Sequence, residues 1–140
     1  MGAVITGQAI PTRHGVTLLA RIAGNAGVPI TQSTLSKIQY ALTDLGSPIG
    51  VGVKTGALTT LTITSVVFDS LQQSDPRWTR DSVGSPGPDG LWGYNFLATL
   101  PASLFANTNM NRQHIDVKFT PVTGEVFYGQ WEWSPLPTYA

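Results

Sequence analysis

The feature that most constrains the fold is a series of short stretches of alternating apolar and polar residues, interrupted by Gly, Pro or Asn. The clearest example lies at 114–120, where Ile115, Val117 and Phe119 alternate with polar neighbours. A turn leads from there into 125–133, which predicts a β-hairpin. Strands do not alternate with helix-length segments, as a parallel sheet would require. We therefore expect an all-β fold, a single antiparallel β-sandwich of six to eight strands.

Further strands are predicted where apolar residues alternate or cluster between turn residues, at 16–23, 36–45, 58–71 and 94–100. The signal at 58–71 is the strongest in the first half of the chain. The second stretch also fits one helix face, but its β-branched and aromatic residues favour a strand. That helix face would contain Leu35, Ile38, Leu42 and Leu45. Two segments remain open: 46–56 is an edge strand or a loop, and 102–105 is long enough for one helical turn.

The length of 140 residues fits one domain, so we assign 1–140 to a single β-sandwich. The ends of the chain, 1–14 and 134–140, are predicted to be extended arms. Residues 72–93 contain Asp-Pro and Asp-Gly pairs and almost no apolar run, which predicts a long loop. Long loops of compact domains are often functional, so this one is a candidate for partner contacts.

Charged residues make up only 11% of the chain, whereas an ordinary soluble domain has roughly 25%. This scarcity suggests that neighbouring molecules cover part of the surface. The formal net charge is zero and basic residues form no run, so we expect no nucleic-acid partner. The chain lacks cysteine, a signal-peptide pattern and a membrane-length apolar stretch. We expect synthesis in the cytoplasm and no membrane contact.

The residues that carry chemistry in other proteins form no defined motif here. His14 and His114 have no serine or carboxylate at the spacing of a nucleophile motif, so polar surface roles are expected for both. Four aspartates in or beside the long loop offer oxygen ligands for calcium, but their spacing matches no defined calcium loop, and solvated turn positions explain them better: Asp69, Asp75, Asp81 and Asp89. We expect no catalytic residue, no metal and no cofactor, and hence no enzyme.

Large aromatic residues in the long loop and on the last strands are the candidate partner contacts: Trp78, Trp92, Tyr94, Trp131 and Trp133. Trp131 and Trp133 are two residues apart and share one strand face, which is either a core face or a contact surface. Exposed tryptophans also stack on sugar rings. A carbohydrate-binding or adhesion module using Trp78, Trp92 or Trp131 is therefore the alternative function.

Several short motifs, mostly in the second half of the chain, resemble those of small phage-encoded and phage-related virion proteins: 67–71, Trp78-Thr79, Asp81, 94–96, Pro101, Phe119-Thr120 and Gly124-Glu125. The resemblance implies an immunoglobulin-like or related sandwich that cements or decorates a head, neck, tail or baseplate. Its partners would be other virion subunits or copies of itself, its location the virion, and no catalytic residue is implied. The chain departs from the pattern at 82–92, where a Gly- and Pro-rich insertion follows Asp81.

Overall fold

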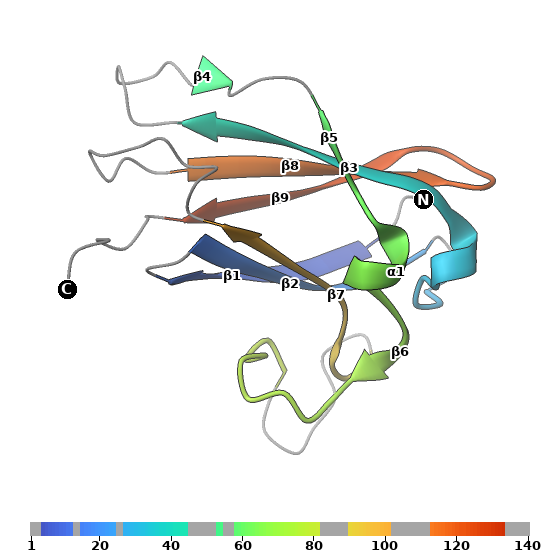
Figure 1. Ribbon diagram of the computed structural model, residues 1–140. Helices are drawn as coiled ribbons and strands as arrows, with labels where there is room; N and C mark the ends of the chain where they lie inside the picture. The colour runs from blue at the N-terminus through green and yellow to red at the C-terminus, as the bar shows by residue number, and fades with distance from the viewer. Residues whose placement is uncertain are drawn as a thin grey trace.

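The computed structural model describes residues 4–12, 15–24, 27–44, 53–54, 58–81, 90–101 and 113–133. They form two antiparallel sheets packed face to face (Figure 1). Sheet A has the order β1 (Val4–Thr12), β2 (Gly15–Ala23), β7 (Tyr94–Pro101) and β6 (Val67–Gln72). Sheet B has the order β4 (Val53–Lys54), β3 (Leu35–Asp44), β8 (Gln113–Pro121) and β9 (Phe127–Trp133), and β5 (Thr59–Leu61) pairs with β3. The all-β sandwich predicted from the sequence is confirmed.

The predicted hairpin is formed by β8 and β9, in continuous register from Gln113↔Trp133 to Phe119↔Phe127. On β8, Ile115, Val117 and Phe119 are fully buried, as their alternation predicts. On β9, Trp131 and Trp133 face the same core, which answers the question about their shared face. Gly124 closes the turn with a φ of 102°, a conformation that favours glycine.

Strand β3 confirms the strand interpretation of 36–45 over the helical one. It pairs with β8 on one side and with β4 and β5 on the other, so it is a central strand of sheet B. Ile38 and Tyr40 are buried at alternate positions, while Lys37 is exposed. The sequence favours a strand over a helix here only weakly. The neighbouring strands decide for the strand, because they supply partners for its backbone hydrogen bonds.

The start of the chain differs from the prediction of an extended arm over 1–14. Residues 4–12 form β1, which pairs with β2 along its whole length from Val4↔Ala23 to Thr12↔Gly15. All nine residues of β2 are buried, so this strand needs a neighbour on each side, β1 on one and β7 on the other. Gly7 and Pro11 weaken the strand pattern of β1, and an edge strand tolerates both residue types.

The stretch 58–71, predicted to be one strand, is divided by a helical turn, α1 (Ile63–Val66). β5 pairs with β3 in sheet B, whereas β6 pairs with β7 in sheet A. One straight strand cannot belong to both layers, so α1 carries the chain across the edge of the sandwich (Figure 1). The side chain of Gln32, in the short 3-10 helix η1 (Gln32–Thr34), donates to the Val67 carbonyl at 2.8 Å where β6 begins.

Some predicted segments lie outside the described residues: 102–105, 134–140, and all of 46–56 except β4. Within the described part of the chain, no helix is long and apolar enough to cross a membrane.

The aromatic residues at the centre of the core are tightly packed between the two sheets. The ring of Phe96 lies edge-on to Phe119 at 5.4 Å and stacks on Trp131 at 5.8 Å. Two glycines make room for the indole: a Cβ added at Gly129 would lie 2.8 Å from the Trp131 ring, and one at Gly7 would lie 2.9 Å from its Nε1. Close packing of this tryptophan therefore depends on the absence of side chains at both positions.

We expect Gly129→Ala to lower the free energy of unfolding by about 1–3 kcal/mol, because the new methyl group overpacks the core against Trp131. Urea unfolding followed by tryptophan fluorescence measures this change. Gly24→Ala is the control, since a Cβ there meets its nearest atom, the Val28 carbonyl oxygen, at 3.8 Å. Equal stability losses in the two variants would contradict the steric explanation.

Candidate functional site

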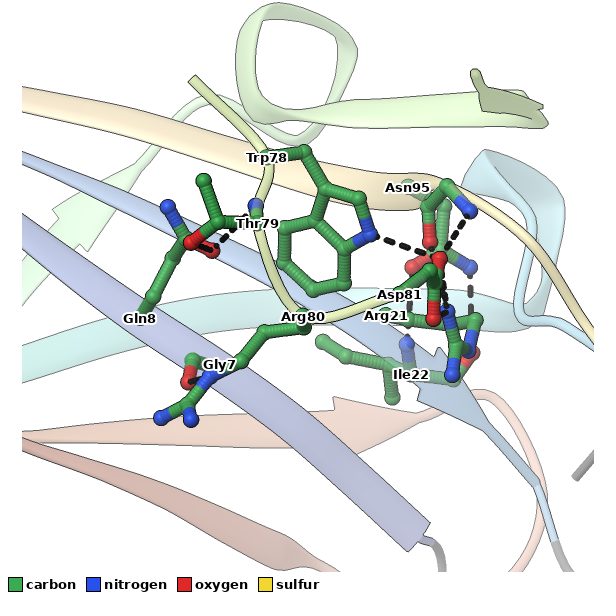
Figure 2. A network of polar contacts seen from close by, with 10 residues as sticks. Gly7, Gln8, Arg21, Ile22, Trp78, Thr79, Arg80, Asp81 and Asn95 are labelled. Carbon is green, nitrogen blue, oxygen red and sulfur yellow. Dashed lines mark hydrogen bonds and ion pairs between the residues drawn. The ribbon is translucent and has the colours of Figure 1, made fainter. Parts of the chain in front are cut away.

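The carboxylate of Asp81 lies at the centre of a buried polar network that joins the loop after β6 to sheet A (Figure 2). Arg21 on β2 contacts both of its oxygens through Nη1 at 2.8 Å. The Trp78 indole and the Gly93 backbone N–H each donate to Oδ2, also at 2.8 Å. The Gly93 carbonyl in turn accepts from Arg21 at 3.2 Å. One carboxylate thus connects β2, the loop and the residue before β7.

The two charges of this network are almost completely removed from solvent. The side chains of Arg21 and Asp81 are 2% and 1% exposed. Burial alone would raise the pKa of the Asp81 carboxyl, but hydrogen bonds from Gly93, Trp78 and Arg21 together hold the pKa below its usual range. The guanidinium also lies 5.9 Å from the centre of the Trp78 ring. Removing either partner of such a buried pair strongly lowers stability, because the remaining charge stays buried without its counter-charge.

A second buried side chain, Asn95 on β7, holds the segment that follows β2. Its Oδ1 accepts from the Ile22 N–H at 2.8 Å, and its Nδ2 donates to the carbonyls of Ile22 and Ile30 at 3.0 and 3.2 Å. The Ile30 N–H also donates to the Ile22 carbonyl at 3.0 Å. The position of Ile30 at the end of the sandwich is therefore fixed by sheet A.

The outer part of the loop is attached to β1. Gln8 Oε1 accepts from the Thr79 N–H at 3.0 Å, and its Nε2 donates to the Arg77 carbonyl. Arg80 donates through Nε to the Gly7 carbonyl at 2.8 Å. Figure 2 shows these side chains reaching across between β1 and the loop. The loop thereby occupies hydrogen-bonding groups of an edge strand, a site where unwanted strand pairing would otherwise begin.

Asp75 fastens the beginning of the same loop. Its carboxylate accepts from the Arg77 side chain at 2.7 and 3.1 Å and from the Tyr94 hydroxyl at 2.6 Å. The hydrogen bond from Arg77 is the main reason why the pKa of Asp75 lies well below its usual range, against the opposing effect of burial. Burial and the neighbouring carboxylate raise the pKa of Tyr94.

These shifts predict that acid destabilises the fold. Because the pKa values of Asp75 and Asp81 are lowered in the folded protein, the unfolded chain takes up protons first as the pH falls. Their contribution to stability is complete above the usual aspartate pKa of about 4 and is lost progressively below it. We expect the free energy of unfolding to decrease between about pH 5 and pH 2.5 in urea titrations.

Asp75→Asn should make the free energy of unfolding less dependent on pH in the acid range, because it removes one of the two titrating carboxylates. It should also lower stability at pH 7. Glu125→Gln, at an exposed position, controls for the loss of one negative charge. A free energy of unfolding that stays constant over the acid range would contradict the prediction.

The five aromatic residues predicted as partner contacts do not form one surface. Trp78 and Tyr94 pack together on the outer side of sheet A, with ring centres 5.8 Å apart and Leu19 beneath them. Trp131 and Trp133 are buried between the sheets, and Trp92 is half-buried. Partner contact through these residues stays a prediction. Stacking on a sugar needs an open ring face, which the burial of Trp78 and Trp131 does not favour.

The other polar candidates are engaged in pairs. Asp69 accepts from the Gln32 N–H at 2.7 Å, and His114 Nε2 lies 2.9 Å from Asp116, with Nδ1 3.5 Å from Glu132. Among the described residues, no group of three or more His, Cys, Asp or Glu side chains is arranged to hold a metal ion. His14 and Asp89 lie outside the described residues.

A feature that sequence reasoning missed is an apolar cavity of about 750 Å³ at one end of the sandwich. It is lined by Gly24, 28–30, 33–35 and 121–127, and the ends of β3, β8 and β9 beside it lie at the right in Figure 1. Its rim carries Val28, Val122 and Val126, which are 64%, 62% and 40% exposed. The sequence does contain a signal for this exposed apolar surface. The three valines occur within or next to Gly- and Pro-containing turns, to which β-branched residues are poorly suited.

The lining of this apolar end is mainly apolar, with hydroxyl groups from Ser33, Thr34 and Thr123. Ile30, Leu35 and Phe127 form the inner wall, and Glu125 is the charged residue among those that line the cavity. A volume of this size is within the range of binding pockets, roughly 300–1,000 Å³. The apolar end is therefore suited to an uncharged apolar group, and it is our candidate binding site. Searches with protein-family models, curated proteins and solved structures find no match to this chain.

Proposed function

We propose that this protein is a structural subunit of a phage-like particle and that it acts through protein–protein contacts and not through catalysis. The observation that carries the proposal is the apolar end, where three exposed valines surround a cavity. Exposed apolar groups that gather around a hollow are typical of protein interaction sites. The virion assignment comes from the resemblance of the sequence motifs, and the low charge of the chain supports it.

The buried networks also support a contact role. Asp81 and Asn95 hold the 73–81 loop and the cavity wall against sheet A, so the surfaces offered to a partner are held in place before binding. A surface that is ordered in advance loses less conformational entropy on association. Such rigidity suits a subunit that is repeated many times in one geometry.

The second candidate function, carbohydrate binding, now depends mainly on Trp92. This residue is half-buried, whereas Trp78 and Trp131 are buried. A glycan array with the full-length protein tests the alternative, and binding that is lost in Trp92→Ala would favour it over the structural role.

The direct test is to purify phage-like particles from the source cells on a density gradient and to quantify the protein by mass spectrometry. We expect it to migrate with the particles in many copies and to remain after a high-salt wash, because apolar contacts are not screened by salt. A tagged Val28→Asp variant should be depleted from the particles, whereas a tagged wild-type copy should not. Absence of the wild-type protein from the particles would contradict the proposal.

A further inference from the structure

The cavity at the apolar end has a candidate occupant within the chain itself. We propose that it binds residues 134–140 of a second copy, so that subunits join head to tail. This inference rests on the proposed function, because it names the partner of the same apolar end. It follows from three observations: the chemistry of the cavity, the sequence of 134–140, and the length of β9, which separates the cavity from Trp133.

The cavity favours an occupant without charge. Its lining is apolar apart from hydroxyl groups, backbone and the single carboxylate of Glu125, so a charged group placed inside would be desolvated without an adequate partner. Phe127 contributes an aromatic ring to its walls, and Pro29 and Pro121 contribute apolar pyrrolidine rings. Aromatic groove surfaces are common docking sites for proline-containing segments in extended conformation.

Residues 134–140 have the matching chemistry. Their sequence is SPLPTYA, with two prolines, one leucine, one tyrosine and no charged side chain. Proline restricts the free chain, so a segment of this kind loses little conformational entropy when it binds in an extended form. Leu136, between the two prolines, supplies an apolar side chain of a size that the cavity accommodates.

Trp133, the described residue that precedes 134–140, lies at the opposite end of β9 from the cavity. Phe127, at the start of β9, lines the cavity, and Trp133, at the end of β9, is the residue from which the segment continues. The strand has seven residues and spans roughly 20 Å. Residues 134–140 reach at most about 25 Å when fully extended, so if they turned back along β9, almost none of these seven would lie in the cavity of their own copy. The partner is therefore a second copy.

An interface between two different surfaces of the same chain is heterologous and can close into a ring or extend as a filament. The test uses the full-length chain and two variants that each damage one half of the contact. Val122→Asp puts a charge at the rim of the cavity, and Leu136→Asp puts one in the segment. Tyr128→Asp is the control, because Tyr128 is 58% exposed on β9 and is not part of the cavity lining.

Light scattering after size-exclusion chromatography should show that the wild type and Tyr128→Asp assemble with rising concentration. Each of the other two variants should be monomeric, with at least a 100-fold weaker apparent Kd and an unchanged far-UV circular dichroism spectrum. A one-to-one mixture of the two variants retains one intact cavity and one intact segment. It should form heterodimers of twice the monomer mass and no larger species.

Three results would overturn the inference: a wild type that is monomeric up to millimolar concentration, a Leu136→Asp variant that assembles like the wild type, or a variant mixture that stays monomeric. These results are distinguishable from failure of the proposed function. A monomeric wild type that is nevertheless found in particles would overturn head-to-tail assembly and leave the structural role intact.

Discussion

Asp81→Ala should lower the free energy of unfolding by about 3–5 kcal/mol, the usual result when one partner of a buried ion pair is removed. The substitution leaves the guanidinium of Arg21 buried without its counter-charge, and it removes the acceptor for the Trp78 indole and the Gly93 N–H. Because a domain of this size is stable by only about 5–15 kcal/mol, the variant should lose a large part of its stability. Urea unfolding monitored by circular dichroism measures the loss.

Asp81→Asn is the informative second variant. The amide of this variant keeps one oxygen acceptor but carries no charge. Its free energy of unfolding should therefore lie between those of Asp81→Ala and the wild type. Glu125→Gln, which removes one negative charge from an exposed position, should change stability by no more than about 0.5 kcal/mol. If Asp81→Ala were as stable as Glu125→Gln, the network would have no structural importance.

Gly93→Ala should lower the free energy of unfolding by about 2–5 kcal/mol, from steric overlap and backbone strain together. A Cβ at this position would lie 2.4 Å from the Gln72 carbonyl oxygen and 2.8 Å from its carbon, both backbone atoms that cannot move aside cheaply. Gly93 also has a φ of 97°, which is unfavourable for alanine. Any backbone shift that relieves the overlap would lengthen the hydrogen bonds of Gly93 with Asp81 and Arg21.

Gly124→Ala separates the two causes. Gly124 has nearly the same φ, 102°, but an added Cβ would meet no atom within 4 Å. We expect it to cost only the conformational strain, about 1–2 kcal/mol. Thermal unfolding of the two variants side by side tests this difference, and equal losses would show that the contact with Gln72 is unimportant.

The parts of the fold that could be predicted from sequence are those encoded by local alternation. Ile115, Val117 and Phe119 point to one face whatever surrounds them, and the turn at Gly124 adds a second local signal. The break at Ile63–Val66 could not be predicted in this way, because its β-branched residues suit a strand and only the presence of two sheets requires the helical turn. β1 was missed because Gly7 and Pro11 interrupt its pattern, although an edge strand accommodates both.

The networks that hold the site were beyond a motif search, because their members are far apart in the chain. Arg21 and Asp81 are separated by 60 residues, and Asn95 contacts Ile22 across 73. Asp81 alone is indistinguishable from an ordinary turn aspartate. Arg21 did carry a signal, since it is the one charged residue in the apolar stretch 16–23, and charged residues are rarely buried unless they are paired.

The separation of Arg21 from Asp81 also has a consequence for how the chain is made. At roughly 5–20 residues per second, β2 leaves the ribosome about 3–12 s before Asp81 does, and β7 follows later still. During that interval β2 can pair with β1, but its other edge, which β7 covers in the folded protein, has no partner. The positive charge of Arg21 interrupts this strand and opposes its self-association. We therefore expect the guanidinium to limit aggregation of the unfinished polypeptide before it becomes buried against Asp81.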